Sequence, residues 1–188
     1  MTRIIAGTHG GRQIRTPKGE TTRPTSDRVR EALFSSLESV LGGFAGVRVL
    51  DLFAGSGALG LESLSRGAES AVFVDSDARA VAAVKANVRD LGFTDARVVR
   101  GTARSFVEHA PVGAFDLVFI DPPYAVPTEQ VRDLVEALAE SVTADALFVV
   151  ERSSRDRFDW PPTVEGVRER KYGETTLWLG RPLVESPT

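Results

Sequence analysis

The first regular pattern of hydrophobic and polar positions along the chain lies between residues 27 and 41. Apolar side chains recur there at helical spacing, and the charged residues occupy the other positions, which predicts an amphipathic helix. Ser26 or Asp27 precedes the first apolar position and is expected to cap the helix. The apolar stripe consists of Val29, Leu33, Leu37 and Val40.

From residue 47 onward, short apolar runs alternate with segments of helical character. The runs VRVLDLF, SAVFVD, ARVVRG, FDLVFID and ALFVVE predict five buried strands. Helices are expected between them, over residues 58–67, 76–92, 103–109 and 128–142. This alternation predicts an α/β fold with a doubly wound, mostly parallel sheet.

The end of the chain has a different pattern. VEGVRERKYG and TTLWLG flank a short turn, which predicts a C-terminal antiparallel hairpin rather than another crossover unit. We therefore expect a Rossmann-like α/β domain over residues 25–188, preceded by a small basic β extension over residues 1–24.

The composition narrows the class of protein. The 188 residues, 42% hydrophobic and 26% charged, fit one soluble domain. No apolar run approaches the ~20 residues of a membrane helix, and the amino terminus lacks the apolar core of a secretory signal, which predicts a cytoplasmic protein. The chain has no Cys and only two His, so we expect neither disulfides nor a metal site.

Positive charge concentrates at the amino terminus. Residues 1–30 contain seven Lys or Arg and two acidic residues, a balance of +5, so the rest of the chain carries −8 of the net charge of −3. These basic residues stand among Gly, Thr and Pro, a composition typical of an extended or loosely structured arm. A basic arm on an acidic body indicates a polyanionic partner, although charge alone fits a solvated surface segment equally well.

A glycine-rich segment stands where the first strand of the α/β region ends and a helix begins. DLFAGSGALG, residues 51–60, would let the backbone pass close to a ligand beside the free N–H groups of the helix start. Its G-x-G-x-x-G spacing alone fits a dinucleotide-binding enzyme as well as a methyltransferase.

Two carboxylates are relevant to the choice between a dinucleotide-binding enzyme and a methyltransferase. Asp51 is placed to orient the ammonium group of a methionine moiety, directly or through water, which a pyrophosphate ligand would not need. Asp75, at the tip of the next strand, is placed to bind ribose hydroxyls, a feature that both cofactor classes share. The alternative is a tight turn without a ligand, in which Asp75 or Asp77 caps the following helix.

A second candidate site follows the run FDLVFI, at Asp121-Pro122-Pro123-Tyr124. The two prolines cannot donate ladder hydrogen bonds, so the strand ends at the carboxyl edge where open parallel sheets bind ligands. The Asp121 carboxylate and the Pro122 carbonyl are suited to accept hydrogen bonds from an exocyclic base amine, which restores its nitrogen lone pair for an in-line methyl transfer. Tyr124 would stack on the base. Without a ligand, the same residues would form only a proline-rich turn.

With their flanking segments, these motifs resemble the RsmD family of 16S rRNA guanine-N2 methyltransferases, within the class I S-adenosylmethionine-dependent superfamily. The resemblance runs from about Arg3 to Leu179 and includes IIAGTHGGRQI, TRPTSDRVREALF, DPPY and RERKYG. It implies that a monomer without a metal transfers a methyl group from S-adenosylmethionine to one guanine, position 966 in the usual 16S numbering, in assembled small ribosomal subunits.

The resemblance also assigns roles to individual residues. The catalytic loop would be Asp121, Pro122, Pro123 and Tyr124. The cofactor would contact Asp51, Phe53, Gly55, Gly57, Asp75, Ser76, Thr102 and Ala103. Many class I enzymes have an Asp that binds the adenine amino group at the position where this chain reads Gly-Thr-Ala. In this chain, Thr102 or the backbone of Ala103 would bind the adenine ring instead. RNA phosphates would contact Arg3, Arg12, Arg15, Lys18, Arg23, Arg28 and Lys171.

Other functions fit parts of the sequence. A DNA amino-methyltransferase acting on adenine N6 also combines DPPY with a glycine-rich turn, but such enzymes usually carry a large target-recognition insertion that this chain lacks. A dinucleotide-dependent oxidoreductase leaves DPPY unexplained. A non-catalytic RNA-binding assembly factor would need neither the cofactor residues nor the base-binding loop.

Overall fold

The computed structural model describes residues 2–18 and 26–183. The chain divides into two compact units, Met1–Gly101 and Thr102–Thr188. The first unit contains the basic N-terminal segment and the glycine-rich segment, and the second contains DPPY and the C-terminal hairpin.

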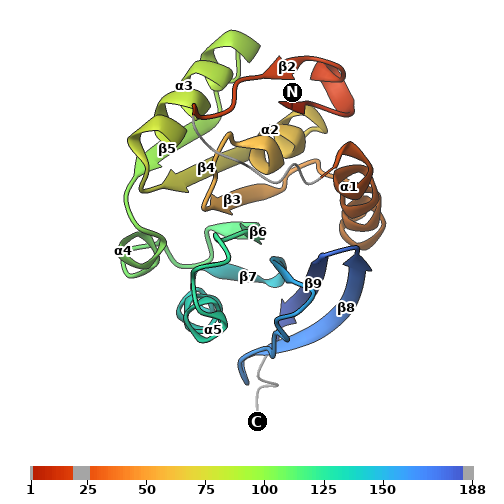
Figure 1. The fold of residues 1–188 in the computed structure, drawn as a ribbon, viewed down its shortest axis with the longest axis vertical. Helices are drawn as coiled ribbons and strands as arrows, with labels where there is room; N and C mark the ends of the chain where they lie inside the picture. Colours follow the sequence, from red (N-terminus) through yellow and green to blue (C-terminus); the bar gives the residue numbers. More distant parts are fainter. Residues whose placement is uncertain (1, 19–25, 184–188) are drawn as a thin grey trace. The chain divides into compact units, whose positions relative to one another are not determined.

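Parallel strands form the sheet of the first unit, in the order β5 (Ala96–Arg100), β4 (Ser70–Asp75) and β3 (Arg48–Leu52). Helix α2 (Ala58–Ser65) connects β3 to β4, and α3 (Ala78–Leu91) connects β4 to β5 (Figure 1). These are the crossover units that the alternating pattern predicts. Because β3 and β4 are parallel, the loops that follow them leave the same edge of this unit's sheet.

Close packing holds α2 against β4. A Cβ atom at Gly60 of α2 would lie 2.3 Å from Cε1 of Phe73, whose side chain is fully buried in β4. Only glycine fits at this helix position, so Gly60 sets the distance between helix and strand. Strand β5 differs from its expected burial, because Arg97 and Arg100 are exposed at the end of the strand order.

Helix α1 (Asp27–Leu41) has the predicted bounds. Ser26 caps it, since the Ser26 hydroxyl accepts a hydrogen bond from the Val29 N–H at 3.3 Å. Gly42 follows the helix with a φ of 75°, the left-handed conformation that commonly ends helices. Leu33 and Leu37 of the predicted stripe are buried together with Phe34, whereas Val29 and Val40 are half-buried.

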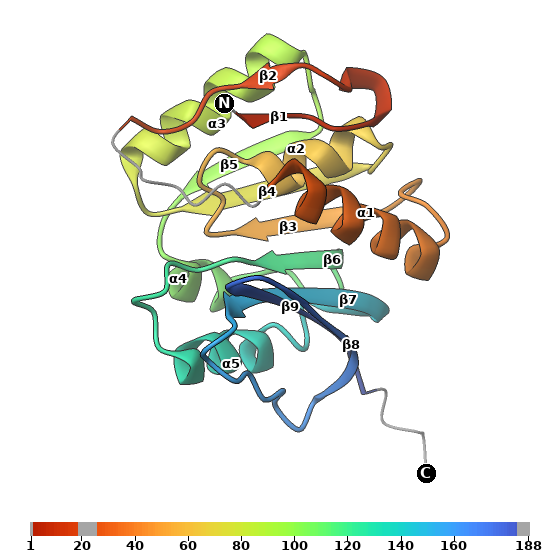
Figure 2. The ribbon, with the colours of Figure 1, turned by 45° about the vertical axis from the view of Figure 1, so that its right-hand side comes forward.

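The N-terminal segment is folded rather than loose. Strands β1 (Thr2–Arg3) and β2 (Gln13–Ile14) pair antiparallel around a short 3-10 helix, η1 (Gly7–His9). Figure 2 shows this ribbon beside α3. The composition indicated a loosely structured arm because glycine and threonine carry no apolar pattern, whereas the segment is held by polar and backbone contacts described below.

The sheet of the second unit contains β6 (Phe115–Ile120), β7 (Val142–Ser153), β9 (Thr175–Pro182) and β8 (Val164–Tyr172), in that order. Strands β6 and β7 are parallel, and β9 is antiparallel to both β7 and β8. The predicted C-terminal hairpin is therefore present as β8 and β9.

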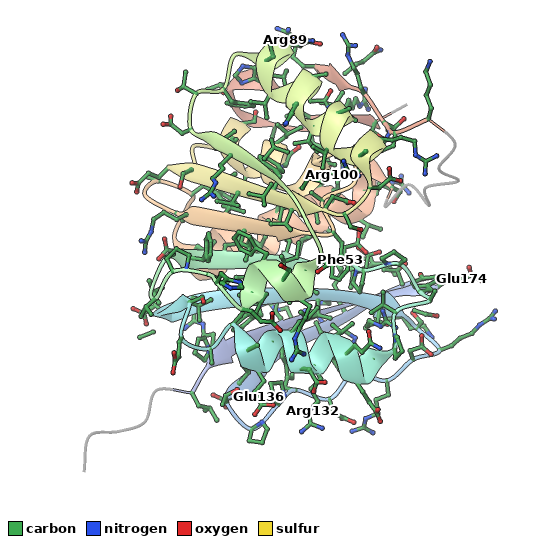
Figure 3. All side chains as sticks on the ribbon, turned by 90° about the vertical axis from the view of Figure 1, so that its left-hand side faces the viewer. Phe53, Arg89, Arg100, Arg132, Glu136 and Glu174 are labelled. Carbon is green, nitrogen blue, oxygen red and sulfur yellow. The ribbon has the colours of Figure 1, made fainter. Side chains whose placement is uncertain are left out.

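Helices α4 (Ala103–Val107) and α5 (Thr128–Ala137) complete the second unit. Charged side chains on α5, Arg132 and Glu136, point away from β7 (Figure 3), while Val131 is buried.

Both helices of the second unit end earlier than the sequence pattern predicts, at residue 107 instead of 109 and at residue 137 instead of 142. The chain turns after α5, where the Ser141 N–H donates to the Leu138 carbonyl. Val142 then pairs with Phe115 and starts β7. A buried valine satisfies a helical stripe and a strand equally well, so the long-range strand pairing decides the boundary.

The architecture confirms the predicted α/β class. Its strands are mostly parallel with crossover helices, a small β extension precedes them and an antiparallel hairpin follows them. The boundary proposed between residues 24 and 25 stays a prediction. Among the described residues, no helix combines the length and the apolar character needed to cross a membrane.

Candidate active site

The segment between β3 and α2, residues 53–57, is called the glycine loop here. Its backbone enters the left-handed region at Phe53, Gly55 and Gly57, with φ values of 57°, 57° and 80°. Glycine adopts this conformation without cost, but a residue with a Cβ atom stores roughly 1–3 kcal/mol of strain. Phe53, labelled in Figure 3, is the only non-glycine residue with positive φ among the described residues, and such outliers cluster at functional turns.

The two glycines of the loop have different surroundings. A Cβ atom at Gly57 would lie 3.2 Å from Val84 and 3.3 Å from Phe73, so this glycine packs against the core of the first unit. A Cβ atom at Gly55 would meet nothing within 4 Å. The backbone at Gly55 therefore faces open space, where a ligand can approach it closely.

Asp75, the last residue of β4, fixes this loop. Its carboxylate accepts hydrogen bonds from the Gly55 N–H and from the Asp77 N–H, each at 2.9 Å. A carboxylate has about four lone-pair sites, so both oxygens retain capacity for further donors such as ribose hydroxyls. Ser76, the next residue, is exposed.

The helix cap at α3 belongs to Asp77 and not to Asp75. The Asp77 carboxylate accepts from the Arg79 N–H at 2.8 Å and forms an ion pair with the Arg79 guanidinium at 2.7 Å. Hydrogen bonds from Arg79 lower the pKa of Asp77 from 3.8 to about 2. Asp75 is thus not needed as a cap.

Asp51 braces the other end of the glycine-rich segment. Its side chain is 1% exposed within β3, and Oδ2 accepts a hydrogen bond from the Gly60 N–H at 3.0 Å. Gly60 lies in the first turn of α2, where the N–H groups have no partner within the helix. The Asp51 carboxylate therefore stabilises the helix start.

Asn87 on α3 is a third brace, which the sequence interpretation missed. Its side chain is 2% exposed, and Nδ2 donates to the Ser56 carbonyl of the glycine loop at 3.0 Å. An asparagine at helical spacing between Val84 and Leu91, on the buried face of α3, is the signal that could have identified it.

The second unit contains the DPPY loop, residues 121–126, which follows β6. Asp121 is half-buried, Pro122 is buried, and Pro123 and Tyr124 are exposed. A turn closes the loop, with the Val126 N–H donating to the Pro123 carbonyl at 3.0 Å. Tyr124 is 40% exposed, so its ring is available to a large ligand.

Arg152, near the end of β7, is a second residue that the sequence interpretation missed. Its side chain is 1% exposed, and Nη2 donates to the Val126 carbonyl at 2.8 Å, with Asp156 at 3.8 Å. Burial lowers the pKa of Arg152, and the charges of Asp156 and Asp121 oppose that shift. Its Nε and Nη1 atoms have no hydrogen-bond partner among the described residues. A buried cation therefore lies behind the DPPY loop, and a single arginine in an apolar run was its only signal in the sequence.

Thr102 and Ala103 stand at the start of α4 in the second unit. The Thr102 hydroxyl accepts from the Ser105 N–H at 3.1 Å and caps the helix, and Ala103 is buried. The hydroxyl oxygen has a second lone pair, which can accept a further hydrogen bond. An adenine contact by Thr102 stays a prediction.

Two of the basic candidates form ion pairs within the described part of the chain. Arg3 forms an ion pair with Asp27 at 2.9 Å, and Arg15 forms one with Asp90 at 2.8 Å. Arg23 lies outside the described residues. The remaining candidates are exposed on the surface of their own unit: Arg12, Lys18, Arg28 and Lys171.

A braced glycine loop after β3, an acid at the end of β4 and a DPPY loop after β6 are the elements of a class I methyltransferase, and a solved structure agrees with that fold. Escherichia coli yhhF is 34% identical with a TM-score of 0.83, over 96% of this chain and 97% of that chain. Residues 2–181 match the family model described as conserved hypothetical protein 95. The chain belongs to this family, the RsmD family of methyltransferases.

Two relatives extend the comparison. The Bacillus subtilis protein YlbH is 37% identical over 180 residues, which cover 92% of this chain and 95% of that protein. Ribosomal RNA small subunit methyltransferase D of Escherichia coli is 42% identical over 122 residues, which cover 65% of this chain and 60% of that protein.

Proposed function

We propose that the chain transfers a methyl group from S-adenosylmethionine to the exocyclic N2 amine of a guanine in 16S rRNA, within assembled small ribosomal subunits. The first unit holds the methyl donor, and the DPPY loop of the second unit holds the target amine. The observation that carries the proposal is the contrast between a glycine loop fixed by Asp75 and a DPPY loop that exposes an aromatic ring.

The residues of the first unit fit an adenosine and methionine ligand. Gly55 leaves open space beside the backbone, and Asp75 keeps acceptor capacity for two neighbouring hydroxyls. Asp51 provides a buried negative charge for an ammonium group, directly or through water. When bound, the sulfonium compound supplies an electrophilic methyl group with a good leaving group, so the protein has mainly to align the acceptor.

The residues of the DPPY loop fit a base amine. The lone pair of a guanine N2 is delocalised into the ring, which makes this nitrogen a weak nucleophile. Hydrogen bonds from the amine to the Asp121 carboxylate and the Pro122 carbonyl favour a tetrahedral nitrogen with a localised lone pair. The carboxylate can then accept the proton that the methylated nitrogen releases. The exposed Tyr124 ring would stack on the base, a contact worth about 1–3 kcal/mol.

An RNA substrate is supported by the relatives and by the surface charge. The Escherichia coli relative is named for methylation of small-subunit ribosomal RNA. Arg12 and Lys18 are exposed on the N-terminal segment and Lys171 on β8, where each can contact a phosphate.

A transfer assay with tritium-labelled S-adenosylmethionine tests reaction and substrate together. Naked 16S rRNA, small subunits and duplex DNA are offered in parallel, and the labelled nucleoside is identified after digestion. We expect label in N2-methylguanine from small subunits. Label in N6-methyladenine from DNA would overturn the substrate assignment, and absence of label from every substrate would overturn the proposed reaction.

A further inference from the structure

We propose that the N-terminal segment, residues 2–18, positions the methyl-donor loop as well as contacting RNA, and that Asn87 couples the two. The inference rests on the proposed function, because it assigns the glycine loop to the donor. It makes donor affinity depend on how the segment is docked.

The side-chain amide of Asn87 contacts both elements at once. Its Oδ1 accepts from the Arg15 N–H at 2.7 Å, and its Nδ2 donates to the Arg15 carbonyl and to the Ser56 carbonyl, each at 3.0 Å. Both amide hydrogens are thus used, one on the segment and one on the glycine loop. Because the side chain is 2% exposed, water cannot replace a lost partner without opening the packing.

A second anchor ties the segment to α2, the helix that begins at the glycine loop. The Glu62 carboxylate is fully buried and accepts from the Ile5 N–H at 2.8 Å and the Ala6 N–H at 3.0 Å. A Cβ atom at Gly7 would lie 1.9 Å from the Ser65 carbonyl oxygen, so the two backbones are in direct contact. Arg66 also pairs with Glu62 at 2.8 Å.

Undocking the segment would therefore deprive two buried groups of hydrogen-bond partners. The Glu62 carboxylate would lose two donors, and the Asn87 amide would lose its two hydrogen bonds to Arg15. Removing one partner of such a group costs the full desolvation of the other. The docked segment and the ordered glycine loop are consequently one cooperative unit. Two ligands that each favour the ordered form must strengthen each other's binding by the same factor, so phosphate contacts at Arg12 or Lys18 raise donor affinity.

Calorimetry with S-adenosylhomocysteine on the full chain tests the coupling. Asn87→Asp keeps an acceptor for the Arg15 N–H but loses the donors to Ser56 and Arg15, and Asn87→Ala loses all three bonds. We expect either change to raise the dissociation constant about fivefold or more. Gln130→Ala, which removes an exposed carboxamide from α5, is the matched control and should leave it unchanged.

RNA supplies the second arm of the experiment. Saturating small ribosomal subunits should increase the affinity of the wild-type chain for S-adenosylhomocysteine, and this gain should shrink towards none in Asn87→Asp. An equal gain in both proteins would overturn the coupling. Failure of the wild-type chain to bind S-adenosylhomocysteine would instead overturn the proposed function, so the two failures are distinguishable.

Hydrogen exchange on the wild-type chain tests the same coupling without any substitution. Addition of S-adenosylhomocysteine should slow exchange at the Ile5, Ala6 and Arg15 amides together with those of Gly55 and Gly57. Amides of the β8–β9 hairpin serve as the internal control. Protection confined to the glycine loop would show that the segment does not share its opening, and would refute the inference even if both Asn87 variants fail to fold.

Discussion

The glycine loop and the DPPY loop differ in how they are supported, and the proposed function gives each of them a different task. Side chains from β4 and α3 hold the glycine loop at Gly55 and Ser56, and Asp51 holds the helix start that follows it. The DPPY loop has its own turn and one buried cation, Arg152, while two of its four motif residues are exposed. A preformed loop suits a small ligand, whereas an exposed loop can receive a base that is carried on a much larger RNA.

The largest effect should come from the DPPY loop itself. Asp121→Asn keeps the shape of the side chain but replaces a charged acceptor and proton acceptor with a neutral amide. We expect the rate of methyl transfer to fall by about two to three orders of magnitude, as for loss of one preorganised group in a transition state. Binding of S-adenosylhomocysteine, measured by calorimetry, should not change.

Asp145→Asn is the matched control, because it neutralises an exposed carboxylate at the start of β7 in the same unit. It should leave the rate unaltered. If Asp121→Asn turns over at nearly the rate of the control, Asp121 does not take part in methyl transfer. The role proposed for the DPPY loop would then be wrong.

The next largest effect should come from Asp75, which holds the glycine loop at Gly55. Asp75→Ala removes the acceptor for the Gly55 N–H and the expected ribose contact together. Charge-assisted hydrogen bonds contribute about 1.5–3 kcal/mol, so we expect S-adenosylmethionine to bind about 10- to 100-fold more weakly by calorimetry. Glu69→Ala, an exposed carboxylate just before β4, provides the control. An unchanged dissociation constant would mean that the loop does not depend on Asp75.

The two loops were visible in the sequence because each combines rigid local chemistry with a strand end. Glycines at the end of an apolar run and two prolines after another need no knowledge of tertiary contacts. The bounds of α1 were predictable for the same reason, since Ser26 and Gly42 are local signals.

The supports of the loops were not predicted, because they depend on contacts distant in sequence. Asn87 meets Arg15 and Ser56 only after α3 packs, and Arg152 meets Val126 only after β7 pairs with β6. The N-terminal segment likewise looked loose, since its docking uses backbone groups and the buried Glu62 rather than an apolar stripe.

A smaller effect should separate positioning from stability in the DPPY loop. Arg152→Met removes the hydrogen bond to the Val126 carbonyl, and we expect the rate of methyl transfer to fall about tenfold. The substitution also removes two buried nitrogen atoms, Nε and Nη1, that have no hydrogen-bond partner among the described residues. Burying such groups costs free energy, so the free energy of unfolding in urea should stay the same or increase. A large loss of stability with an unchanged rate would show that Arg152 is structural and does not position the loop.

The smallest effect concerns Asp77, which caps helix α3 two residues after Asp75. The pKa of Asp77 is lowered from 3.8 to about 2 by hydrogen bonds from Arg79, so the folded chain binds this proton less readily than the unfolded chain. The stabilising contribution is therefore present above pH 3.8 and is lost as the pH falls towards about 2. Asp77→Asn keeps an acceptor for the Arg79 N–H but has no charge, so thermal unfolding of the two proteins should differ at neutral pH and converge across this window. Equal thermal stability of the two proteins at neutral pH would mean that the cap acts through the hydrogen-bond acceptor that Asn retains rather than through the charge of Asp77.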